Sequence, residues 1–340
     1  MQDTVAIVGG GAWGTALAVS LGRRGDAVRL WMHEDDLVRR MLDRRDNPVF
    51  LPGIEVPKTV APTNDLAAAV EGAAIVVCVI PTPFARGVYD RLAPHLAADP
   101  IVVVATKGIE EDTLLLPTEV AAECLGPGAR TAAMSGPSFA EEVARGVPTA
   151  VVVASRDAAV ARAVQDRLAG DAFRLYTNTD AVGVQIAAAL KNVVAIAAGI
   201  ADGLGFGHNT MAALITRGLA EIRRLGVARG AAPATFSGLA SLGDLVLTCT
   251  GGLSRNRHVG QALGRGERLA DIVARTPHVA EGVRTARSAR SLAQRAGVEM
   301  PIVEEVYRIL YEDGAPRDAV ARLMSRPLGA EDGPPEESAP

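Results

Sequence analysis

A single lysine in an apolar segment is the residue most suited to chemistry. Lys191 is the only charged side chain between Asp180 and Asp202, in a run dominated by Ala, Val and Ile that contains no Pro. Such a run predicts a helix that is buried on nearly every face, in protein or in lipid. Gln185 and Asn192 add polarity, and a Lys at a bilayer centre costs about 2.5 to 3.5 kcal/mol. A protein core is therefore favoured over a membrane span.

Burial would suit Lys191 to proton transfer. Removal from water favours the neutral amine and moves a Lys pKa down toward neutrality, where the group can exchange protons during catalysis. The segment leaves one alternative open, a structural Lys that pairs with a carboxylate or reaches the surface.

A glycine-rich turn follows the first apolar run of the chain. Gly9, Gly11 and Gly14 have the G-x-G-x-x-G spacing directly after VAIV, and the small residue Ala16 follows. In this position the glycines allow a tight turn, a close approach of backbone to a pyrophosphate, and close packing of helix on strand. The next helix N-terminus would offer amides to the phosphates. The turn predicts a dinucleotide site.

The choice between NAD and NADP is not readable from the second strand. That strand ends in Trp31, Met32 and His33, and acidic residues appear only afterwards, at positions 34–36. Arg39 and Arg40 could meet a 2′-phosphate, but solvent-facing side chains are the expectation for both.

Further polar residues lie at the ends of apolar runs. Lys107 follows IVVVAT, where open parallel sheets collect ligands. Ser138 and Glu141 have the spacing of a capping box, which predicts Ser138 as a helix N-cap. Asp244 lies among apolar residues and needs a partner, which a buried lysine or a substrate hydroxyl would provide.

The run Ser254, Arg255, Asn256 suits an anion. Ser254 or Asn256 can cap the following helix, whose amides point outward, and Arg255 can hold a phosphate through two parallel hydrogen bonds. An ordinary capped helix with surface arginines is the alternative.

The pattern of apolar runs predicts an α/β protein with a Rossmann-like, mostly parallel sheet over residues 1–180 and an all-helical region over 181–328. Seven short runs predict strands: VAIVG, VRLWM, AIVVCVI, IVVVATKG, TAAMSG, TAVVVAS and FRLYTN. Seven helices are expected after Asp180, over 181–201, 210–225, 233–242, 256–264, 281–297, 301–312 and 316–324. Residues 329–340, rich in Pro, Gly and acids, predict a disordered tail.

Composition excludes several classes of protein. The net charge of −4 comes from intermixed acids and bases with 4% aromatics, which argues against a nucleic-acid surface or a basic membrane-binding face. The three cysteines are far apart and lack metal-ligand spacing, as expected of reduced thiols in the cytoplasm. No export signal is recognisable at the N-terminus. No metal is expected.

Taken together, these motifs resemble the bacterial type of glycerol-3-phosphate dehydrogenase that uses NAD or NADP. The resemblance covers the chain to about residue 326 through GGGAWGTALA, ATKG, SGPSFA, ALKNVVAIAAGIADGLGFG, LGDLVLTCT and SRNR. It implies Lys191 as proton donor and acceptor. It implies a substrate site formed by Lys107, Gly136, Ser138, Lys191, Asn192, Asp244, Thr248, Ser254, Arg255 and Asn256. It implies cofactor contacts from Gly9, Gly11, Ala12, Trp13, Gly14, His33, Lys107, Ala140, Arg255, Val279 and Glu281.

The resemblance also implies an activity: reversible hydride transfer between NAD(P)H and dihydroxyacetone phosphate, giving sn-glycerol 3-phosphate for glycerophospholipid synthesis, by a cytoplasmic homodimer. One departure is visible, because the family commonly has Ser where this chain has Ala12. Two other functions fit parts of the pattern, a 3-hydroxy acid dehydrogenase and a redox sensor that binds a nicotinamide without turning it over.

Overall fold

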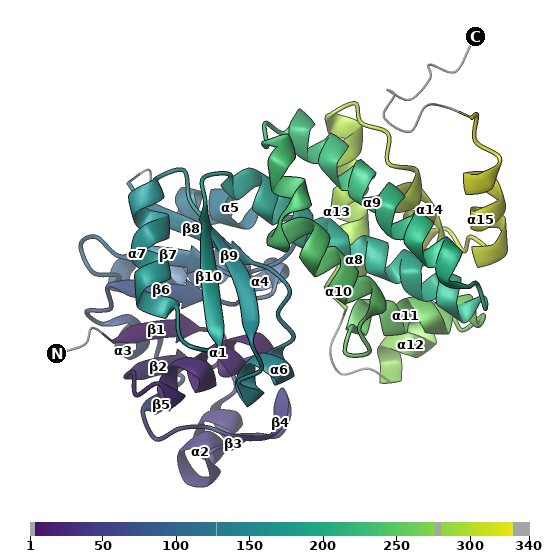
Figure 1. Ribbon diagram of the computed structural model, residues 1–340. Helices are drawn as coiled ribbons and strands as arrows, with labels where there is room; N and C mark the ends of the chain where they lie inside the picture. The colour runs from purple at the N-terminus through teal and green to yellow at the C-terminus, as the bar shows by residue number, and fades with distance from the viewer. Residues whose placement is uncertain (1–3, 127, 276–279, 329–340) are drawn as a thin grey trace.

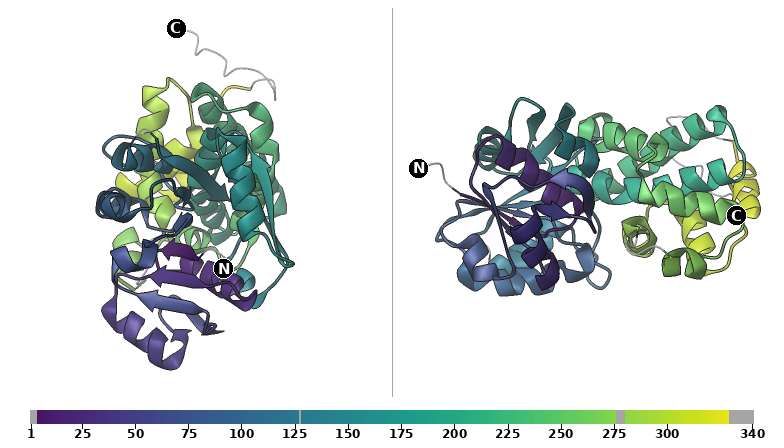
Figure 2. Two further views of the ribbon diagram at one scale, coloured as in Figure 1. Left: turned by 90° about the vertical axis from the view of Figure 1, so that its left-hand side faces the viewer. Right: turned by 90° about the horizontal axis from the view of Figure 1, so that it is seen from below.

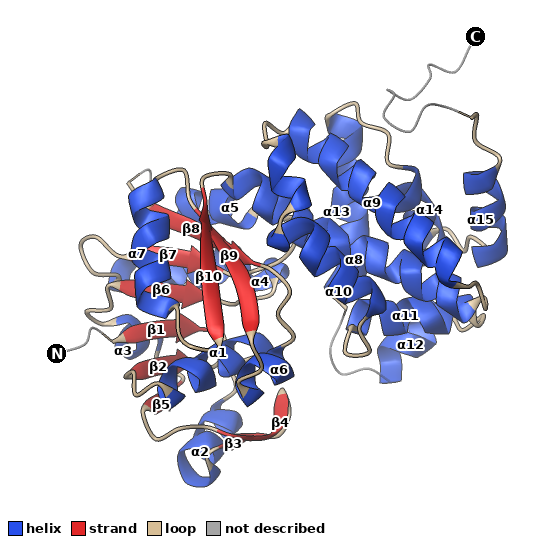
Figure 3. Cartoon of the chain, in the orientation of Figure 1, coloured by secondary structure: helices blue, strands red, loops and turns tan. Residues whose placement is uncertain are grey.

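The computed structural model describes residues 4–126, 128–275 and 280–328. The chain forms a sheet region, which holds the N-terminus, followed by a helical region beside it (Figure 1). Every strand belongs to the first of these regions (Figure 3). The expected fold class is confirmed. Residues 329–340, for which a disordered tail is expected, lie outside the described residues.

The strands are short, as expected for apolar runs between turns. They are β1 (Val5–Val8), β2 (Val28–Trp31), β3 (Asp46–Asn47), β4 (Leu51–Glu55), β5 (Val60–Thr63), β6 (Ile75–Cys78), β7 (Ile101–Val104), β8 (Arg130–Ser135), β9 (Thr149–Ala154) and β10 (Phe173–Asn178). All seven predicted strands are present. The β3–β4 hairpin and the edge strand β5 were not predicted, because their sequences are too short or too rich in Pro and polar residues to show a period.

The sheet region contains α1 (Ala12–Arg23), α2 (Asp35–Arg44), α3 (Leu66–Val70), α4 (Thr82–Leu92), the turn η1 (Ala93–His95), α5 (Pro117–Leu125), α6 (Ala140–Arg145) and α7 (Ala158–Leu168). The helical region contains α8 (Ala181–Gly203), α9 (His208–Ala228), η2 (Pro233–Ser237), η3 (Leu239–Gly243), α10 (Asp244–Thr250), α11 (Arg255–Gly264), α12 (Leu269–Arg275), α13 (Glu281–Arg295), α14 (Pro301–Tyr311) and α15 (Pro316–Met324). The helix expected over 233–242 is instead two short turns, a 3₁₀ turn and a π turn.

The eight-stranded sheet has the order β10-β9-β8-β7-β6-β1-β2-β5, and all its pairs are parallel except β8 with β9. The chain builds outward from β1 to β2 and β5, then returns to the other side of β1 to add β6, β7 and β8. Such a reversal of strand order opens a crevice at the carboxyl ends of the strands, which is where doubly wound sheets bind ligands. Gly9 and Lys107 follow the ends of β1 and β7.

Both faces of the sheet are covered, because its central strands are apolar at every position. Val5 and Ile7 of β1 pack with α1, α6 and α7, whereas Ala6 and Val8 pack with α3, α4 and α5. Buried strands of this kind are typical of parallel sheets with helices on both sides.

Helix α8 runs through the middle of the helical region, and α9, α10, α11, α13 and α14 pack around it (Figure 2). Among the described residues it alone is long and apolar enough to cross a membrane, but 94% of its apolar window is buried inside the chain. Its apolar side chains therefore pack against neighbouring helices. This agrees with the protein core that the sequence favours over a membrane span. Its lysine, Lys191, lies where this helix meets the sheet region.

Candidate active site

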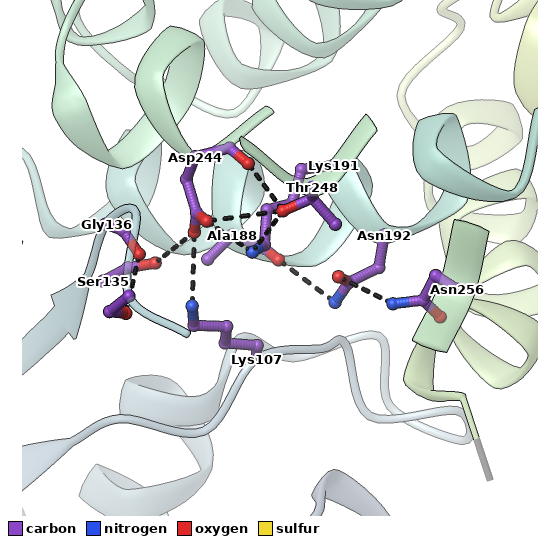
Figure 4. A network of polar contacts seen from close by, with 10 residues as sticks. Lys107, Ser135, Gly136, Ala188, Lys191, Asn192, Asp244, Thr248 and Asn256 are labelled. Atoms are coloured by element: carbon purple, nitrogen blue, oxygen red, sulfur yellow. Dashed lines mark hydrogen bonds and ion pairs between the residues drawn. The ribbon is translucent and has the colours of Figure 1, made fainter. Parts of the chain in front are cut away.

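Lys191 and Lys107 meet at one carboxylate. The Nζ atom of Lys191 donates to Oδ1 of Asp244 at 2.6 Å, and Nζ of Lys107 lies 3.2 Å from Oδ2 of the same residue (Figure 4). The Asp244 side chain is 1% exposed, that of Lys191 7% and that of Lys107 16%. Of the two partners expected for Asp244, a buried lysine or a substrate hydroxyl, the structure shows the buried lysine. The two cations come from opposite regions, so the site forms where the sheet region meets the helical region.

The proton affinity of Lys191 is set by competing effects. Burial lowers the pKa of its ammonium to about 8, Asp244 opposes that shift, and the positive charge of Lys107 adds to it. One carboxylate cannot neutralise two ammonium groups, so the arrangement favours the loss of one proton. Lys191 can therefore give up and regain a proton near neutral pH.

Two hydroxyl groups complete the surroundings of this carboxylate. Thr248 lies one turn after Asp244 on α10, and its Oγ1 accepts from Nζ of Lys191 at 3.0 Å while donating to the Asp244 carbonyl at 2.6 Å. Ser135 ends β8, is buried, and lies with its Oγ 3.5 Å from Oδ2 of Asp244. Ser135 was not predicted, although its place at a strand end before Gly136 is a signal that could have identified it.

A second set of polar contacts joins three helices beside Lys191. The amide of Asn256 on α11 donates to Oδ1 of Asn192 on α8 at 2.9 Å, and its own Oδ1 accepts from the backbone N–H of Gly282 on α13 at 2.9 Å. Both polar atoms of this buried amide are therefore engaged within the protein. The amide of Asn192 has a weaker partner, the carbonyl of Ala188 at 3.5 Å.

The α11 N-terminus presents its first turn close to these residues. Ser254 is the N-cap, and its Oγ accepts from the backbone N–H of Arg257 at 3.2 Å. The next residue, Arg255, is exposed. Because the first amides of a helix have no intrahelical partner, this end attracts anions, and Arg255 adds a positive charge.

The dinucleotide turn has the geometry that its glycines predict. Gly9 has a φ of +123°, and a Cβ there would lie 2.3 Å from the Val79 carbonyl oxygen. At Gly14 a Cβ would lie 1.8 Å from the Gly9 oxygen, whereas nothing lies within 4 Å of one at Gly11. The turn is closed toward the sheet and open at Gly11. Helix α1 starts at Ala12 and has no side-chain cap, so its first amides remain available to a phosphate group.

The buried side-chain amide of Asn47 hydrogen-bonds to the glycine-rich turn. Nδ2 of Asn47, which is 1% exposed, donates to the Gly10 carbonyl at 3.0 Å and to Oγ1 of Thr15 at 2.9 Å. Thr15 also donates to the Gly10 carbonyl at 3.0 Å. Asn47 belongs to the unpredicted β3, so sequence reasoning missed it.

The remaining cofactor candidates lie on separate elements of the two regions. Trp13 is partly buried in the first turn of α1, with its ring centroid 6.2 Å from that of Phe173. His33 is exposed after β2, and Ala140 begins α6. Glu281 begins α13, where burial raises the pKa of its carboxyl and Arg255 and the two site lysines oppose the shift. Val279 lies outside the described residues. Arg39 and Arg40 are exposed, as expected.

The predicted capping role of Ser138 is wrong. Phe139 is the N-cap of α6, and the Ser138 hydroxyl instead donates to the Gly136 carbonyl at 2.8 Å. Glu141 pairs with Arg145 one turn later rather than reaching back. Gly136, which has a φ of +149° and would place a Cβ 2.8 Å from Cα of Val151, makes a close turn directly before this helix.

Comparison with known proteins points to one family. Residues 4–161 and 180–321 match the family profiles described as the N-terminus and C-terminus of NAD-dependent glycerol-3-phosphate dehydrogenase. The glycerol-3-phosphate dehydrogenase [NAD(P)+] of Citrifermentans bemidjiense is 53% identical over 97% of this chain and 99% of its own, and that of Geobacter sulfurreducens is 54% identical over the same shares. The crystal structure of glycerol-3-phosphate dehydrogenase from Coxiella burnetii has a TM-score of 0.91 at 42% identity, covering 96% of this chain and 99% of the other.

Proposed function

The chain belongs to the NAD-dependent glycerol-3-phosphate dehydrogenases, and from this premise we propose how its own residues carry out the reaction. The reaction is the reversible transfer of a hydride between NAD(P)H and dihydroxyacetone phosphate, with sn-glycerol 3-phosphate as the product. The observation that carries the proposal is the single buried carboxylate of Asp244 between the ammonium groups of Lys191 and Lys107.

The cofactor site lies at the turn after β1. Its fit rests on the open space at Gly11 and on the uncapped amides of α1, which together form a cradle for a pyrophosphate. Ala12 offers a backbone N–H but no hydroxyl. In this proposal Gly9, Gly11, Ala12, Trp13, Gly14, His33, Lys107, Ala140, Arg255, Val279 and Glu281 hold the dinucleotide. When bound, its nicotinamide supplies or accepts the hydride.

Lys191 transfers the proton. Negative charge develops on the ketone oxygen as the carbonyl carbon of dihydroxyacetone phosphate is reduced, and the Lys191 ammonium protonates that oxygen. Lys107 stabilises the developing charge electrostatically. Asp244 and Thr248 keep Nζ of Lys191 in one position through bonds of 2.6 and 3.0 Å. In the oxidation direction the neutral amine of Lys191 takes the proton back.

The phosphate is held away from the reacting carbon. Arg255 and the α11 amides after Ser254 bind it, and Asn256 keeps this helix end against Asn192. In this proposal Gly136 and Ser138, which follow the end of β8, contact the substrate from the sheet region. Binding energy at the phosphate then fixes the position of the carbonyl.

The experiment that tests this proposal is an absorbance assay with NADH and NADPH in parallel, each with dihydroxyacetone phosphate. Lys191→Ala should keep its affinity for the cofactor and lose turnover by about 10²- to 10⁴-fold. Arg255→Ala should raise the KM for dihydroxyacetone phosphate, and a shorter ketone without phosphate should be insensitive to it. Turnover of Lys191→Ala within threefold of the unaltered enzyme would remove Lys191 from the proton step.

We also propose a division of the chain at residue 180 into a dinucleotide-binding domain and a substrate domain. The uncapped α1 end supports the first assignment and the Lys191 network the second. A cytoplasmic homodimer that supplies glycerophospholipid synthesis is proposed on the strength of the family. The free thiols of Cys78, Cys124 and Cys249 accord with a reducing compartment. Light scattering of the purified protein tests the dimer.

A further inference from the structure

The segment between Lys107 and α5, residues 108–116, joins the two regions of the molecule. We call it the lysine loop. We propose that the lysine loop is a tether that fixes Lys107 against Asp244, with Leu114 as its anchor in the helical region and the Glu110 ion pair as its brace on the sheet region. This inference rests on the role proposed for Lys107. Leu114 and Glu110 are then positioning residues, since they act through that lysine.

The loop inserts apolar side chains into the neighbouring region. Ile109, Leu114 and Leu116 are 3%, 8% and 0% exposed, and they belong to the hydrophobic core that surrounds α8 rather than to either core of the sheet region. That core includes Ile186 and Leu190, the latter adjacent to Lys191. Burial of three apolar side chains stabilises the loop in this position. Three of its side chains therefore pack in the helical region, whereas Leu115 packs against a core of the sheet region, so the loop contacts both.

Leu114 reaches its place at the expense of backbone strain. Its φ is +61°, in the left-handed region, which is unusual for a residue that is neither Gly, Asn nor Asp. Such a conformation is strained and persists only where the surroundings hold it. Two backbone bonds close the turn around it, from Leu114 N–H to the Glu110 carbonyl at 3.0 Å and from Glu110 N–H to the Leu115 carbonyl at 3.0 Å. Burial of the leucine side chain offsets the strain.

Charged groups hold the loop on the other side. Arg86 of α4 donates to both carboxylate oxygens of Glu110, at 3.0 and 2.7 Å, and the Thr113 hydroxyl donates to Oε2 of Glu110 at 2.5 Å. The Arg86 guanidinium holds the pKa of the Glu110 carboxyl below its usual range. Arg295 of α13 donates to the Thr113 carbonyl at 3.3 Å. The loop is thus tied to α4 and to α13 at once.

Position and charge give the tether its effect on chemistry. Lys107 directly precedes the loop and reaches Asp244, which is 137 residues away in sequence, at 3.2 Å. A displacement of about 1 Å in such a group can lower a rate by about 10²-fold. Withdrawal of the Lys107 charge would also raise the pKa of Lys191, since that charge now lowers it. A variant with a loosened loop should therefore show the same kinetic changes as Lys107→Ala.

The test is a double-mutant cycle with Leu114→Ala and Lys107→Ala, read by steady-state kinetics over a range of pH. Leu114→Ala should raise the KM for dihydroxyacetone phosphate by about tenfold, lower kcat, and move the pH at which reduction falls off to a higher value. In the Lys107→Ala background the same change should alter these values by less than about threefold, because both changes act on one group. An undiminished effect of Leu114→Ala in that background would overturn the inference.

Two further variants separate positioning from folding. Leu310→Ala removes the same side chain from the same core, on α14, and should lower stability without changing KM or the pH profile. Thr113→Val lies on an exposed residue, so the protein should fold normally while losing the hydroxyl bond to Glu110 and shifting KM in the direction of Leu114→Ala. If Lys107→Ala alone leaves KM and kcat unchanged, the role proposed for Lys107 fails and the tether has no function to support. If Lys107→Ala acts and Leu114→Ala does not, the tether alone is wrong.

Discussion

Lys191 carries a pH dependence whose sign differs between the two directions of the reaction. Since burial lowers its pKa to about 8, the ammonium that donates a proton during ketone reduction is lost as pH rises through that value. The rate of dihydroxyacetone phosphate reduction should fall above about pH 8, whereas oxidation of glycerol 3-phosphate, which needs the neutral amine, should rise over the same range. Profiles of kcat/KM in both directions measure this. Parallel profiles in the two directions would contradict the assignment.

Asp244 and Lys107 act on this pKa with opposite signs, which gives a second prediction. Asp244→Asn removes the charge that raises the pKa of Lys191, so the fall in reduction should move to lower pH, and kcat at neutral pH should drop by about 10²- to 10³-fold. Lys107→Ala should move the fall to higher pH. Asp202→Asn is a matched control, because Asp202 lies on the helix of Lys191 but pairs with Arg257 and Gln261. If Asp244→Asn and Lys107→Ala shift the profile in the same direction, then Lys191, Asp244 and Lys107 do not interact as the structure indicates.

Residue types identified part of the site from the sequence. Lys191 was identifiable because a charge in an apolar helix is rare, and Gly9 and Gly14 because their spacing has a steric reason. A buried lysine was one of two partners expected for Asp244, but the sharing of this carboxylate by two lysines 53 and 137 residues away was not readable, since no local pattern encodes a contact between distant segments. Leu114 was also missed, because its positive φ is imposed by the core it enters rather than by its own preference.

At the scale of elements, α8 and α11 pack closely through glycines. Gly199 and Gly203 of α8 face Gly260 and Gly264 of α11, and a Cβ at Gly260 would lie 2.1 Å from the Ile196 carbonyl oxygen. Gly260→Ala should therefore lower the free energy of unfolding by about 3 kcal/mol and displace the nearby Asn256. Gly87→Ala, in an exposed position of α4 with nothing within 4 Å of the added Cβ, should raise stability by up to about 1 kcal/mol. Denaturant titration of both variants measures the contrast, and equal effects would exclude close packing of the two helices.

A buried carboxylate joins α9 to α14. Glu221 is 3% exposed and accepts the first free amides of α14, from Ile302 at 2.8 Å and Val303 at 3.3 Å. Burial raises the pKa of Glu221 to about 7, while these two bonds and the charges of Arg224 and Arg326 oppose the shift. Because the folded pKa lies above the ordinary value of 4.5, its contribution to stability is complete below about pH 4.5 and is lost as pH rises through 7.

Glu221→Gln should expose that dependence, since glutamine does not titrate. The stability of the unaltered protein relative to Glu221→Gln should decline between pH 5 and pH 8 by roughly 2 to 3 kcal/mol. Urea unfolding at both pH values measures the difference. A difference independent of pH would mean that the helix amides keep the carboxylate charged throughout.

Helices and strands were predictable where a periodic segment was long or a run was strongly apolar. The strands β1 and β7 and the helices α8 and α13 fall close to their expected ranges. The segment 233–242 was expected as a helix but forms 3₁₀ and π turns, and Asp180 accepts from the Ala232 amide and the Thr235 hydroxyl at its start. Ser254 was one of two caps expected for α11 and is its N-cap, whereas Ser138 was assigned wrongly as a cap, because Phe139 is the N-cap of α6.

At the scale of the whole molecule, the sheet and helical regions share cores. Leu114 and Leu116 are buried in the core around α8, and Val184 of α8 packs with Ala133 and Val152 of the sheet. Regions that interlock in this way should unfold together rather than in sequence. The distribution of tryptophan allows a direct measurement, since Trp13 and Trp31 both lie in the sheet region while most helical residues lie in the other.

Thermal unfolding followed by tryptophan fluorescence and by far-ultraviolet circular dichroism should therefore give one coincident transition. NADH, which binds the sheet region, should raise both transitions equally, because a ligand of the folded state stabilises every part that unfolds with its site. At 100 times its Kd the added stability is about 2.7 kcal/mol. A rise confined to the fluorescence transition would mean that the two regions unfold independently. The contacts between the two regions would then contribute less to stability than the contacts within each region. In that case the lysine loop could not keep Lys107 next to Asp244.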